Sequence, residues 1–398
     1  MRKLLLLLLL LNSQYARLVA DDNDMPIIAY GGVPHWQTTD ENYRVFSECG
    51  FNVSLYNYQS LEQLVQACRQ AEKYGVKILG SCPEMTDQPY RAALMLRYEK
   101  GFFGYLMKDE PNNPEIRLLQ QDISQLRAID NTHVFYINLL PYYRKDWVKS
   151  SLKVDTYEEY LRTASSTSCQ QISFDYYPVT TEGIRPTWYH NLEMVRKESL
   201  ASGKPFWGFA LSVPHDVPFT TDTYYPTPTL ASLRLQVYSN LAYGAQAIQY
   251  FTYWTPPSGN YRYHDAPISF EGEKTATYAL VQQMNQELKT ISKLFYGATV
   301  VSVHHLGTVP EGTTQLERMP VNVRSLRTVG TPGAVVSEID KDGHRYLAIV
   351  NKSHTQPMVV QFEALNNVPL HLTKTLQTEA VRPSYNVSPG DLLLFRLR

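Results

Sequence analysis

The chain reads Gly104-Tyr105-Leu106-Met107-Lys108-Asp109-Glu110-Pro111-Asn112 at the point that decides its fold. A run that is mostly apolar at successive positions ends in two carboxylates, and an amphipathic helical pattern over residues 114–129 follows it. Runs of this kind are typical of parallel strands that are covered on both faces. The segment therefore predicts one β/α unit with two carboxylates at the carboxyl end of its strand.

The same pattern recurs along the first two thirds of the chain. Further apolar runs occupy residues 26–32, 52–57, 76–81, 134–139, 171–176, 205–212 and 247–253, and helical patterns occupy residues 61–74, 157–165 and 230–243. Eight such units in about 230 residues favour a (β/α)₈ TIM barrel over an open doubly wound sheet. No glycine-rich phosphate loop follows the first run, which argues against a nucleotide-binding fold.

The β/α pattern of the sequence ends after a helical pattern at residues 275–293. Short strands are predicted at 300–305, 334–339, 346–350, 358–362 and 392–397, separated by Gly, Asn, Asp or Pro. We therefore expect an α/β fold with a catalytic barrel over residues 25–295 and a small C-terminal antiparallel β-sandwich domain over 296–398. Packing against the barrel is the favoured role of this second domain, and sugar binding is the alternative.

The N-terminus resembles an export signal. Arg2 and Lys3 precede a leucine run over residues 4–11, and the small residues Ala16 and Ala20 follow. This pattern predicts a signal peptide over residues 1–20 and a periplasmic or extracellular protein, with a buried N-terminal helix as the alternative. The run is too short to span a bilayer and no later run is long enough, so we expect no membrane anchor.

Charge and metal-ligand spacing narrow the function. The 37 basic and 38 acidic side chains form no basic stripe, which argues against a nucleic-acid partner. The four cysteines have no zinc or CxxC spacing and are expected to be buried thiols; they are Cys49, Cys68, Cys82 and Cys169. His190, His215 and His264 lie too far apart for a ligand motif, so a metal-dependent hydrolase is only a weak alternative. We expect no metal and no cofactor.

The catalytic candidates are the carboxylates at strand ends, because active sites of such barrels lie at the carboxyl ends of the strands. Glu110, next to Asp109, is predicted to be a general acid, since a neighbouring carboxylate and partial burial raise the pKa. Asp175, at the end of the sixth strand, is the third candidate. The alternative is that Asp109 and Glu110 cap the following helix.

Other polar and aromatic residues near the ends of strands three to eight are expected to bind substrate. They are Glu84, Asn112, Asn138, Tyr176, Tyr177, His215, Tyr250, Tyr253 and Trp254. Carboxylates do acid–base work at an anomeric carbon, and aromatic rings stack on sugar C–H faces. Each ring taken alone is more often a core residue than a ligand-binding one. Together these residues predict a glycosidase whose substrate is an oligo- or polysaccharide.

Four segments of the chain carry a family resemblance. Leu233-Arg234-Leu235-Gln236-Val237-Tyr238-Ser239-Asn240-Leu241-Ala242-Tyr243-Gly244-Ala245 and Ile248-Gln249-Tyr250-Phe251-Thr252-Tyr253-Trp254 resemble the last helix–strand unit of family 42 β-galactosidases and related barrels of their clan. Tyr263-His264-Asp265-Ala266-Pro267-Ile268 is similar to the loop that follows. The segment from Tyr105 to Asn112 resembles the strand that carries the acid/base glutamate, and Glu110 falls on that position. The resemblance implies a barrel and retaining glycosidase ancestry.

The chain departs from this family at strand seven. Residues 205–212 read PFWGFALS, without the nucleophilic glutamate that the family carries there, and Asp109 stands where the family usually has Asn. Three accounts follow. The Asp109-Glu110 pair resembles that of substrate-assisted hexosaminidases, in which the 2-acetamido group of the substrate is the nucleophile. Alternatively Asp175, or less favourably Glu84 or Asp216, is the second catalytic group. Finally, the barrel could bind sugar without cleaving it.

Overall fold

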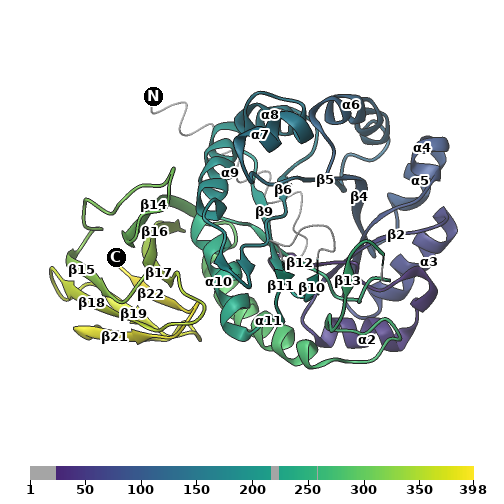
Figure 1. Cartoon of the computed structure of the whole chain (residues 1–398). Helices are drawn as coiled ribbons and strands as arrows, with labels where there is room; N and C mark the ends of the chain where they lie inside the picture. Colours follow the sequence, from purple (N-terminus) through teal and green to yellow (C-terminus); the bar gives the residue numbers. More distant parts are fainter. Residues whose placement is uncertain (1–23, 217–223, 258) are drawn as a thin grey trace.

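The protein is described by a computed structural model over residues 24–216, 224–257 and 259–398 (Figure 1). Eight parallel strands close into a barrel in the order β1-β12-β9-β6-β5-β4-β3-β2. They are β1 (Ile27–Tyr30), β2 (Val53–Asn57), β3 (Lys77–Ser81), β4 (Phe102–Asp109), β5 (Val134–Leu139), β6 (Ile172–Phe174), β9 (Phe206–Leu211) and β12 (Ala247–Phe251). Each lies on one of the predicted apolar runs, so the predicted (β/α)₈ fold is confirmed.

Helices surround the barrel (Figure 1). The longer ones are α2 (Asp40–Glu48), α3 (Leu61–Glu72), α5 (Pro89–Leu96), α6 (Asn113–Arg127), α8 (Tyr157–Ser165), α9 (Trp188–Ser202), α10 (Leu230–Tyr243) and α11 (Ala276–Phe295). Side-chain caps fix several starts: Ser60, Thr156 and Thr229 each accept a bond from a backbone N–H of the first turn. Periodicity predicts α3, α6, α8, α10 and α11. It misses α9 because polar Asn191 and Glu193 are buried beside its apolar residues, which blurs the stripe.

The barrel interior is packed below its mouth. Ile28, Leu79, Leu106, Tyr136 and Trp207 belong to one buried cluster that fills the closed sheet. Alternate residues of the same strands face outward and pack beneath the helices in the main core. Because the interior is filled, substrate can reach only the carboxyl ends of the strands.

The C-terminal region consists of two antiparallel sheets, with strand orders β14-β16-β17-β22-β19-β20 and β15-β18-β21. Their bounds are β14 (Thr299–Gly307), β15 (Val323–Val329), β16 (Gly333–Lys341), β17 (His344–Asn351), β18 (Met358–Ala364), β19 (Leu370–Leu372), β20 (Thr378–Ala380), β21 (Ser384–Val387) and β22 (Leu392–Arg396). The predicted antiparallel β domain is confirmed, although β15, β19, β20 and β21 were not predicted. Residues 299–398 are all described and contain no helix.

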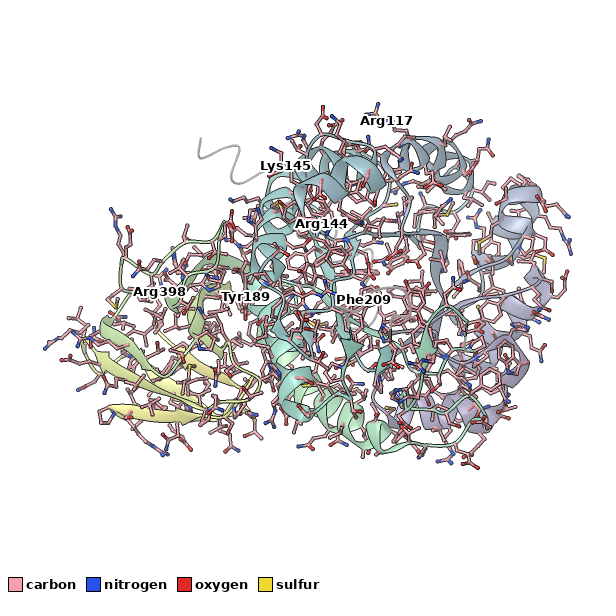
Figure 2. The ribbon with its side chains drawn as sticks, viewed as in Figure 1. Arg117, Arg144, Lys145, Tyr189, Phe209 and Arg398 are labelled. Carbon is pink, nitrogen blue, oxygen red and sulfur yellow. The ribbon has the colours of Figure 1, made fainter. Side chains whose placement is uncertain are left out.

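These sheets pack against the side of the barrel that carries α10 and α11 (Figure 1). Ser337 on β16 donates a hydrogen bond to the Ala242 carbonyl at 2.6 Å, and the Tyr243 hydroxyl lies 2.9 Å from Nε2 of His305. Tyr189 of α9, labelled in Figure 2, meets the His305 ring edge-on at 5.1 Å. Apolar residues of β14 and β16 join the main core. These contacts fit the favoured role of the domain, which is packing on the barrel.

Three further features bear on the sequence expectations. The predicted signal peptide, residues 1–20, lies outside the described residues. Within the described part, none of the helices is long and apolar enough to cross a membrane. The four cysteines are buried and unpaired, as expected.

Candidate active site

A bulge in β4 turns Asp109 into the barrel. The register between β4 and β5 pairs Leu106 with Tyr136 but Lys108 with Ile137, so Met107 is an extra residue. Leu106 lies inside the barrel, whereas Met107 packs toward the outer core and Lys108 pairs with Glu115 of α6 at 2.9 Å. Regular alternation from Leu106 would point Asp109 outward. The bulge reverses that phase, which is a recurrent way of aiming a side chain into a site.

Asp109 is held by two hydrogen-bond donors. The Tyr30 hydroxyl at the end of β1 donates to Oδ2 at 2.8 Å, and Nδ2 of Asn138 donates to Oδ1 at 3.1 Å. Burial and the Asp109 charge raise the pKa of Tyr30 far above its ordinary value, so its hydroxyl stays a donor. Nδ2 of Asn138 also donates to Oδ1 of Asp175 at 3.2 Å. One amide therefore connects the carboxylates that end β4 and β6.

Glu110 follows Asp109 with its backbone in the left-handed region, φ 49°, which is rare for a residue with a Cβ. Its N–H donates to the Asn138 carbonyl at 2.9 Å, which holds this conformation. The Glu110 side chain comes within hydrogen-bonding reach of the Asp175 carboxyl. Such strained residues are concentrated at functional sites, where the surrounding structure fixes them. Three carboxyl groups thus meet at one place in the barrel mouth.

Helix capping, the alternative role predicted for Asp109 and Glu110, is performed by other residues. Oδ1 of Asn112 accepts a bond from the Glu115 N–H at 3.1 Å, and Oε2 of Glu115 accepts from the Asn112 N–H at 2.8 Å. This reciprocal capping box starts α6. Asn112 is therefore a helix cap, which corrects its predicted place among the substrate-binding residues.

The electrostatics of the cluster favour a retained proton. Asp109 and Glu110 are open to water, but they stand in a recess surrounded by protein atoms. Burial and the Asp109 charge raise the pKa of Glu110 to about 7. Asp175 is buried, and burial with the charges of Glu110 and Asp109 raises its pKa well above the ordinary value. Among the described residues, no cation is one of the main influences on the pKa of any of the three. A carboxyl that stays protonated near pH 7 can serve as a general acid.

The opposite side of the mouth is aromatic. Phe209 of β9 lies 6.2 Å from the Tyr30 ring and 6.3 Å from the Tyr177 ring, and Tyr177 stacks on Phe251 at 5.6 Å. Figure 2 labels Phe209 within the barrel. All of β9 is described, and it carries no carboxylate. Strand seven therefore contributes the apolar side chain of Phe209 to the mouth.

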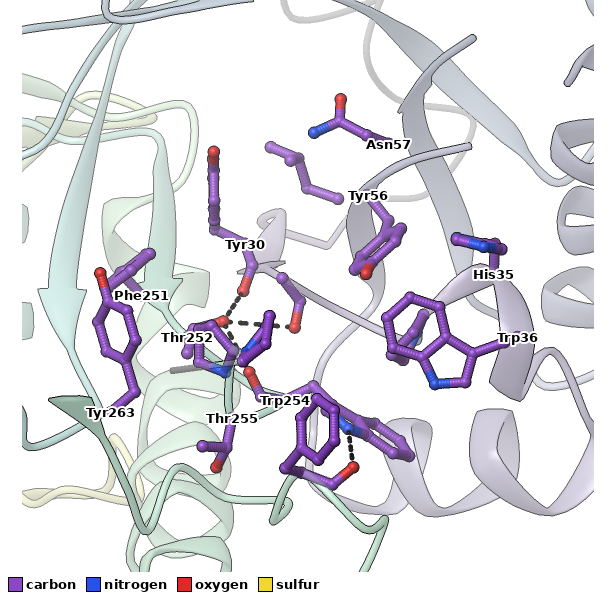
Figure 3. A pocket seen from close by; sticks show the side chains of 16 residues that line it. Tyr30, His35, Trp36, Tyr56, Asn57, Phe251, Thr252, Trp254, Thr255 and Tyr263 are labelled. Atoms are coloured by element: carbon purple, nitrogen blue, oxygen red, sulfur yellow. Dashed lines mark hydrogen bonds between the residues drawn. The ribbon is translucent and has the colours of Figure 1, made fainter. Parts of the chain in front are cut away.

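An aromatic pocket of about 350 Å³ adjoins the cluster through Tyr30 (Figure 3). It is formed by the ends of β1, β2 and β12 and the segments after them. Trp36 and Tyr56 lie on one side of it, and Phe251 and Tyr263 lie on the other (Figure 3). Tyr263 is close enough to Glu110 for that charge to raise the pKa of the Tyr263 hydroxyl. The pocket and the carboxyl cluster are therefore neighbouring parts of one mouth.

The structure corrects the predicted rim position of three tyrosines. Tyr250 and Tyr253 are buried, with their rings 5.3 and 5.5 Å from Phe51 in the main core. Tyr250 faces outward because it alternates with Gln249, which bonds to Tyr136 inside the barrel. Tyr176 is buried as well, with its hydroxyl 2.8 Å from the Thr187 hydroxyl. Its neighbour Tyr177 is the residue that reaches the carboxyl cluster.

Other candidates lie beside or outside the cluster. Oε2 of Glu84 accepts a bond from the Leu61 N–H at 3.1 Å, at the start of α3. His215 stacks on Tyr225 at 4.4 Å, behind the aromatic wall, and Asp216 pairs with Arg262. Of the predicted residues, Asp109, Glu110, Asn138, Asp175 and Tyr177 meet at the cluster, and Trp254 lines the pocket. Among the described residues, no three His, Cys, Asp or Glu are grouped to hold a metal ion.

Sequence reasoning missed Tyr30, Phe209, Trp36 and Tyr263 as site residues. Tyr30 and Asn57 end the first two strands, so the rule that active sites lie at the carboxyl ends of barrel strands points to them as well. Trp36 belongs to a short 3₁₀ helix, η1 (His35–Gln37), and Tyr263 to a two-residue strand, β13 (Arg262–Tyr263). Neither had a periodic signal that could have marked it.

Comparison with known proteins agrees with this architecture. Residues 118–291 match the profile of glycoside hydrolase family 42, described as β-galactosidase. The match covers less than half of the chain; it begins after Glu110 and includes Asp175, β9 and β12. No curated protein matches the chain significantly.

Solved structures share the fold at low identity. The β-galactosidase of Bacillus circulans sp. alkalophilus has 10% identity and a TM-score of 0.65, covering 95% of this chain and 100% of that one. A catalytic variant of a family 42 β-galactosidase from G. stearothermophilus has 7% identity and a TM-score of 0.58, covering 94% and 98%. A family 5 glycoside hydrolase from Bacteroides vulgatus has 11% identity and a TM-score of 0.57, covering 94% and 88%. The chain is a (β/α)₈ barrel, and its similarity over residues 118–291 to the profile of the family 42 β-galactosidases indicates a glycosidase.

Proposed function

We propose that this chain hydrolyses glycosidic bonds of uncharged glycosides with Glu110 as the general acid. The observation that carries the proposal is the meeting of Glu110, Asp109 and Asp175 in the barrel mouth, where burial and the Asp109 charge raise the pKa of Glu110 to about 7. A carboxylic acid with this pKa can protonate a leaving oxygen at neutral pH. β-Galactosides are the first substrates to test, because the matching family profile is described by that activity.

Charge supports a neutral substrate. No cation is one of the main influences on the pKa of the three carboxyls among the described residues, so an anionic sugar would meet mainly negative charge there. Uronic acids and sulfated sugars are accordingly poor substrates under this proposal.

Asp175 is the first candidate for the second catalytic group. It is hydrogen-bonded to Asn138 and lies within hydrogen-bonding reach of Glu110. In this account Asp175 shares the proton of Glu110 in the free site and acts as base or nucleophile once a glycoside is bound.

Substrate assistance is the second candidate mechanism, and one observation favours it. The three carboxyls stand on β4 and β6 or just after them, whereas β9 offers Phe209 to the same mouth. If no carboxylate attacks the anomeric carbon, a 2-acetamido group of the substrate could do so. Asp109, fixed by Tyr30 and Asn138, would then orient that group. This account requires a 2-acetamido sugar.

We also propose that the protein is exported, as its N-terminal sequence pattern indicates. The substrate would then be an extracellular or periplasmic glycoside. Detection of a mature N-terminus near residue 21 in the secreted fraction would support this, and a protein retained in the cytoplasm with its leucine run intact would contradict it.

The test of the proposed function is a hydrolysis screen with aryl glycosides, including 4-nitrophenyl β-galactoside and its 2-acetamido counterparts. On the methyl glycoside of a sugar that is cleaved, whose leaving group needs a proton, the wild-type protein is then compared with Glu110→Gln, whose side chain is similar in shape but carries no acidic proton. Hydrolysis by the wild type that the variant largely loses supports the proposal. Binding of sugar without turnover in either protein would instead make the barrel a carbohydrate-binding protein.

A further inference from the structure

A second pocket lies where the last helix of the barrel meets the larger sheet of the C-terminal domain. It has a volume of about 260 Å³ and is lined by the last turn of α11, the turn between β16 and β17, and parts of β17, β19, β20 and β22. Just after α11, the Gly297 N–H donates to the side chain of Gln246, which directly precedes β12, at 2.7 Å. The pocket therefore lies at the amino ends of the barrel strands, at the opposite end of the barrel from the carboxyl cluster.

Strand register gathers the polar lining on one face of the sheet. Directly opposite residues of antiparallel strands share a face, and the register pairs Lys341 with His344 and Tyr346 with Arg396. Because His344 and Tyr346 are two positions apart in β17, all four side chains lie on the same face. Further along this face, Leu394 belongs to the main core. The pocket thus forms where the packing of this face on the barrel ends.

The lining carries an excess of positive charge. One carboxylate, that of Asp342, stands against four basic side chains: Lys293, Lys341, His344 and Arg396. Nζ of Lys341 donates to the Tyr296 carbonyl at 2.7 Å, which holds this lysine at the end of α11. Within the described part of the chain, the side chains of Lys293 and Arg396 have neither a hydrogen bond nor an ion pair. Two cations of the pocket are therefore available to a ligand.

Neighbouring carboxylates do not neutralise this charge. Asp340, next to Lys341 in β16, pairs with Arg345 at 3.4 Å. Glu379, in β20, pairs with Arg382 at 3.2 Å. Asp24 is close enough to raise the pKa of Tyr296, but it is not part of the lining. An anion that enters the pocket would therefore meet mainly positive charge.

The remaining lining indicates the kind of anion. Leu294 and Leu372 are buried and Leu376 is half-buried, so they give the pocket an apolar wall, and Tyr346 and Thr378 add hydroxyl groups. A volume of about 260 Å³ corresponds to about nine water molecules at about 30 Å³ each, which is more than a bare phosphate or sulfate ion fills. Guanidinium and ammonium groups donate strong hydrogen bonds to such oxyanions. The cations and the apolar wall together fit an oxyanion that carries an organic group.

We propose that this pocket binds a phosphate or sulfate monoester, with the oxyanion held by Lys293 and Arg396 and the organic group against the leucines. This second binding function does not rest on the proposed glycosidase activity, because the two sites lie at opposite ends of the barrel. The ligand contacts α11 and the strands of the C-terminal domain at once. Binding therefore stabilises the two domains together and raises the melting temperature.

The first experiment measures binding to the full chain by isothermal titration calorimetry at one fixed ionic strength. The probes are phenyl phosphate, phenyl sulfate, inorganic phosphate, inorganic sulfate and phenol. We expect one saturable site for at least one ester, an affinity at least about fivefold higher than that of the corresponding inorganic ion, and no binding of phenol there. The tighter of the two esters shows which oxyanion the site prefers.

The second experiment assigns the binding to the pocket. Lys293→Gln and Arg396→Gln should each lower the affinity for the tighter ester about tenfold, as for loss of a hydrogen bond from a charged group. Lys289→Gln is the matched control, because Lys289 is exposed one turn earlier on α11 and lies outside the pocket; it should change the affinity less than about twofold. Lys293 is also exposed, so its variant keeps the core, which an unchanged melting temperature without ligand verifies. The ester should raise the melting temperature of the wild type more than that of Lys293→Gln.

Four results would overturn the proposal. They are the absence of saturable binding of either ester, an affinity that Lys293→Gln leaves unchanged, an equal loss in Lys289→Gln, and inorganic ions that bind as tightly as their esters. An equal loss in the control would mean that diffuse positive charge attracts the anion, and equal binding of inorganic ions would mean that the leucines take no part. None of these measurements uses turnover, so they stand whether or not a glycoside is cleaved.

Discussion

The two sides of the barrel mouth differ in chemistry although one closed sheet builds both. The β4–β6 side brings together Asp109, Glu110 and Asp175, with Asn138 bonded to two of them. The side formed by β1, β9 and β12 contributes rings, including Phe209 and Phe251. The difference teaches that the ionisable groups and the aromatic rings of this mouth come largely from different strands, and that strand seven itself carries no carboxylate.

The largest expected effect is on the carboxyl side. Glu110→Gln should lower kcat by at least about 10² on a glycoside with an alkyl leaving group, because the leaving oxygen loses its proton donor. The measurement is steady-state hydrolysis, with the melting temperature as the control for folding. Near-wild-type turnover would remove Glu110 from the mechanism.

Asp175→Asn separates the two mechanistic candidates. If Asp175 is the second catalytic group, kcat should fall about 10²-fold or more while ligand binding persists, and azide should restore activity. Under substrate assistance, only 2-acetamido sugars are cleaved and the substitution mainly weakens binding. A full-rate variant acting on a sugar without an acetamido group would contradict both accounts.

Asp109→Asn should change the pH profile. Activity requires protonated Glu110, so it falls as the pH rises through the Glu110 pKa of about 7. The Asp109 charge helps to raise that pKa, and its removal should lower it. The alkaline limb of kcat/KM should therefore move to lower pH, and each unit of this shift lowers the rate on that limb about tenfold. An unmoved or alkaline-shifted limb would contradict the assigned coupling. Complete loss at every pH, restricted to 2-acetamido substrates, would favour substrate assistance.

The smallest effect should come from the junction of the two sides. Tyr30→Phe keeps the ring that contacts Phe209 but removes the hydrogen bond to Asp109. We expect kcat to fall about tenfold, as for loss of one bond to a charged group. Phe209→Leu is the matched control on the aromatic side and should affect binding more than kcat. If Phe209→Leu lowered kcat more than Tyr30→Phe did, the carboxyl side and the aromatic side would not have the separate roles assigned to them.

The fold could be predicted because its signals are local. Residues 134–139 and 230–243 contain continuous apolar runs or clear helical patterns, and they form β5 and α10 with those bounds. The region around α9 gave no such signal because buried Asn191 and Glu193 interrupt its apolar positions. Secondary structure was therefore readable in long apolar stretches, including α10, which is buried nearly all round, whereas the short amphipathic α2 was not predicted.

The site was only partly predictable because it depends on the phase of strand alternation and on contacts between residues that are far apart in the sequence. The bulge at Met107 aims Asp109 inward, but no single-sequence pattern marks a bulge. Tyr250 was expected at the rim, whereas strand alternation turns it into the outer core. Tyr30 meets Asp109 across 79 positions of sequence, a contact that only the closure of the barrel creates.

The most direct test of the central claim is the dependence of the Glu110→Gln effect on the leaving group. Wild type and variant are compared on methyl, phenyl and 2,4-dinitrophenyl glycosides of one cleaved sugar. If Glu110 is the general acid, the loss in kcat/KM should be at least about 10²-fold for the methyl glycoside and shrink toward none for dinitrophenyl, whose departure needs no proton. An equal loss across the series, or no loss with the methyl glycoside, would contradict the account.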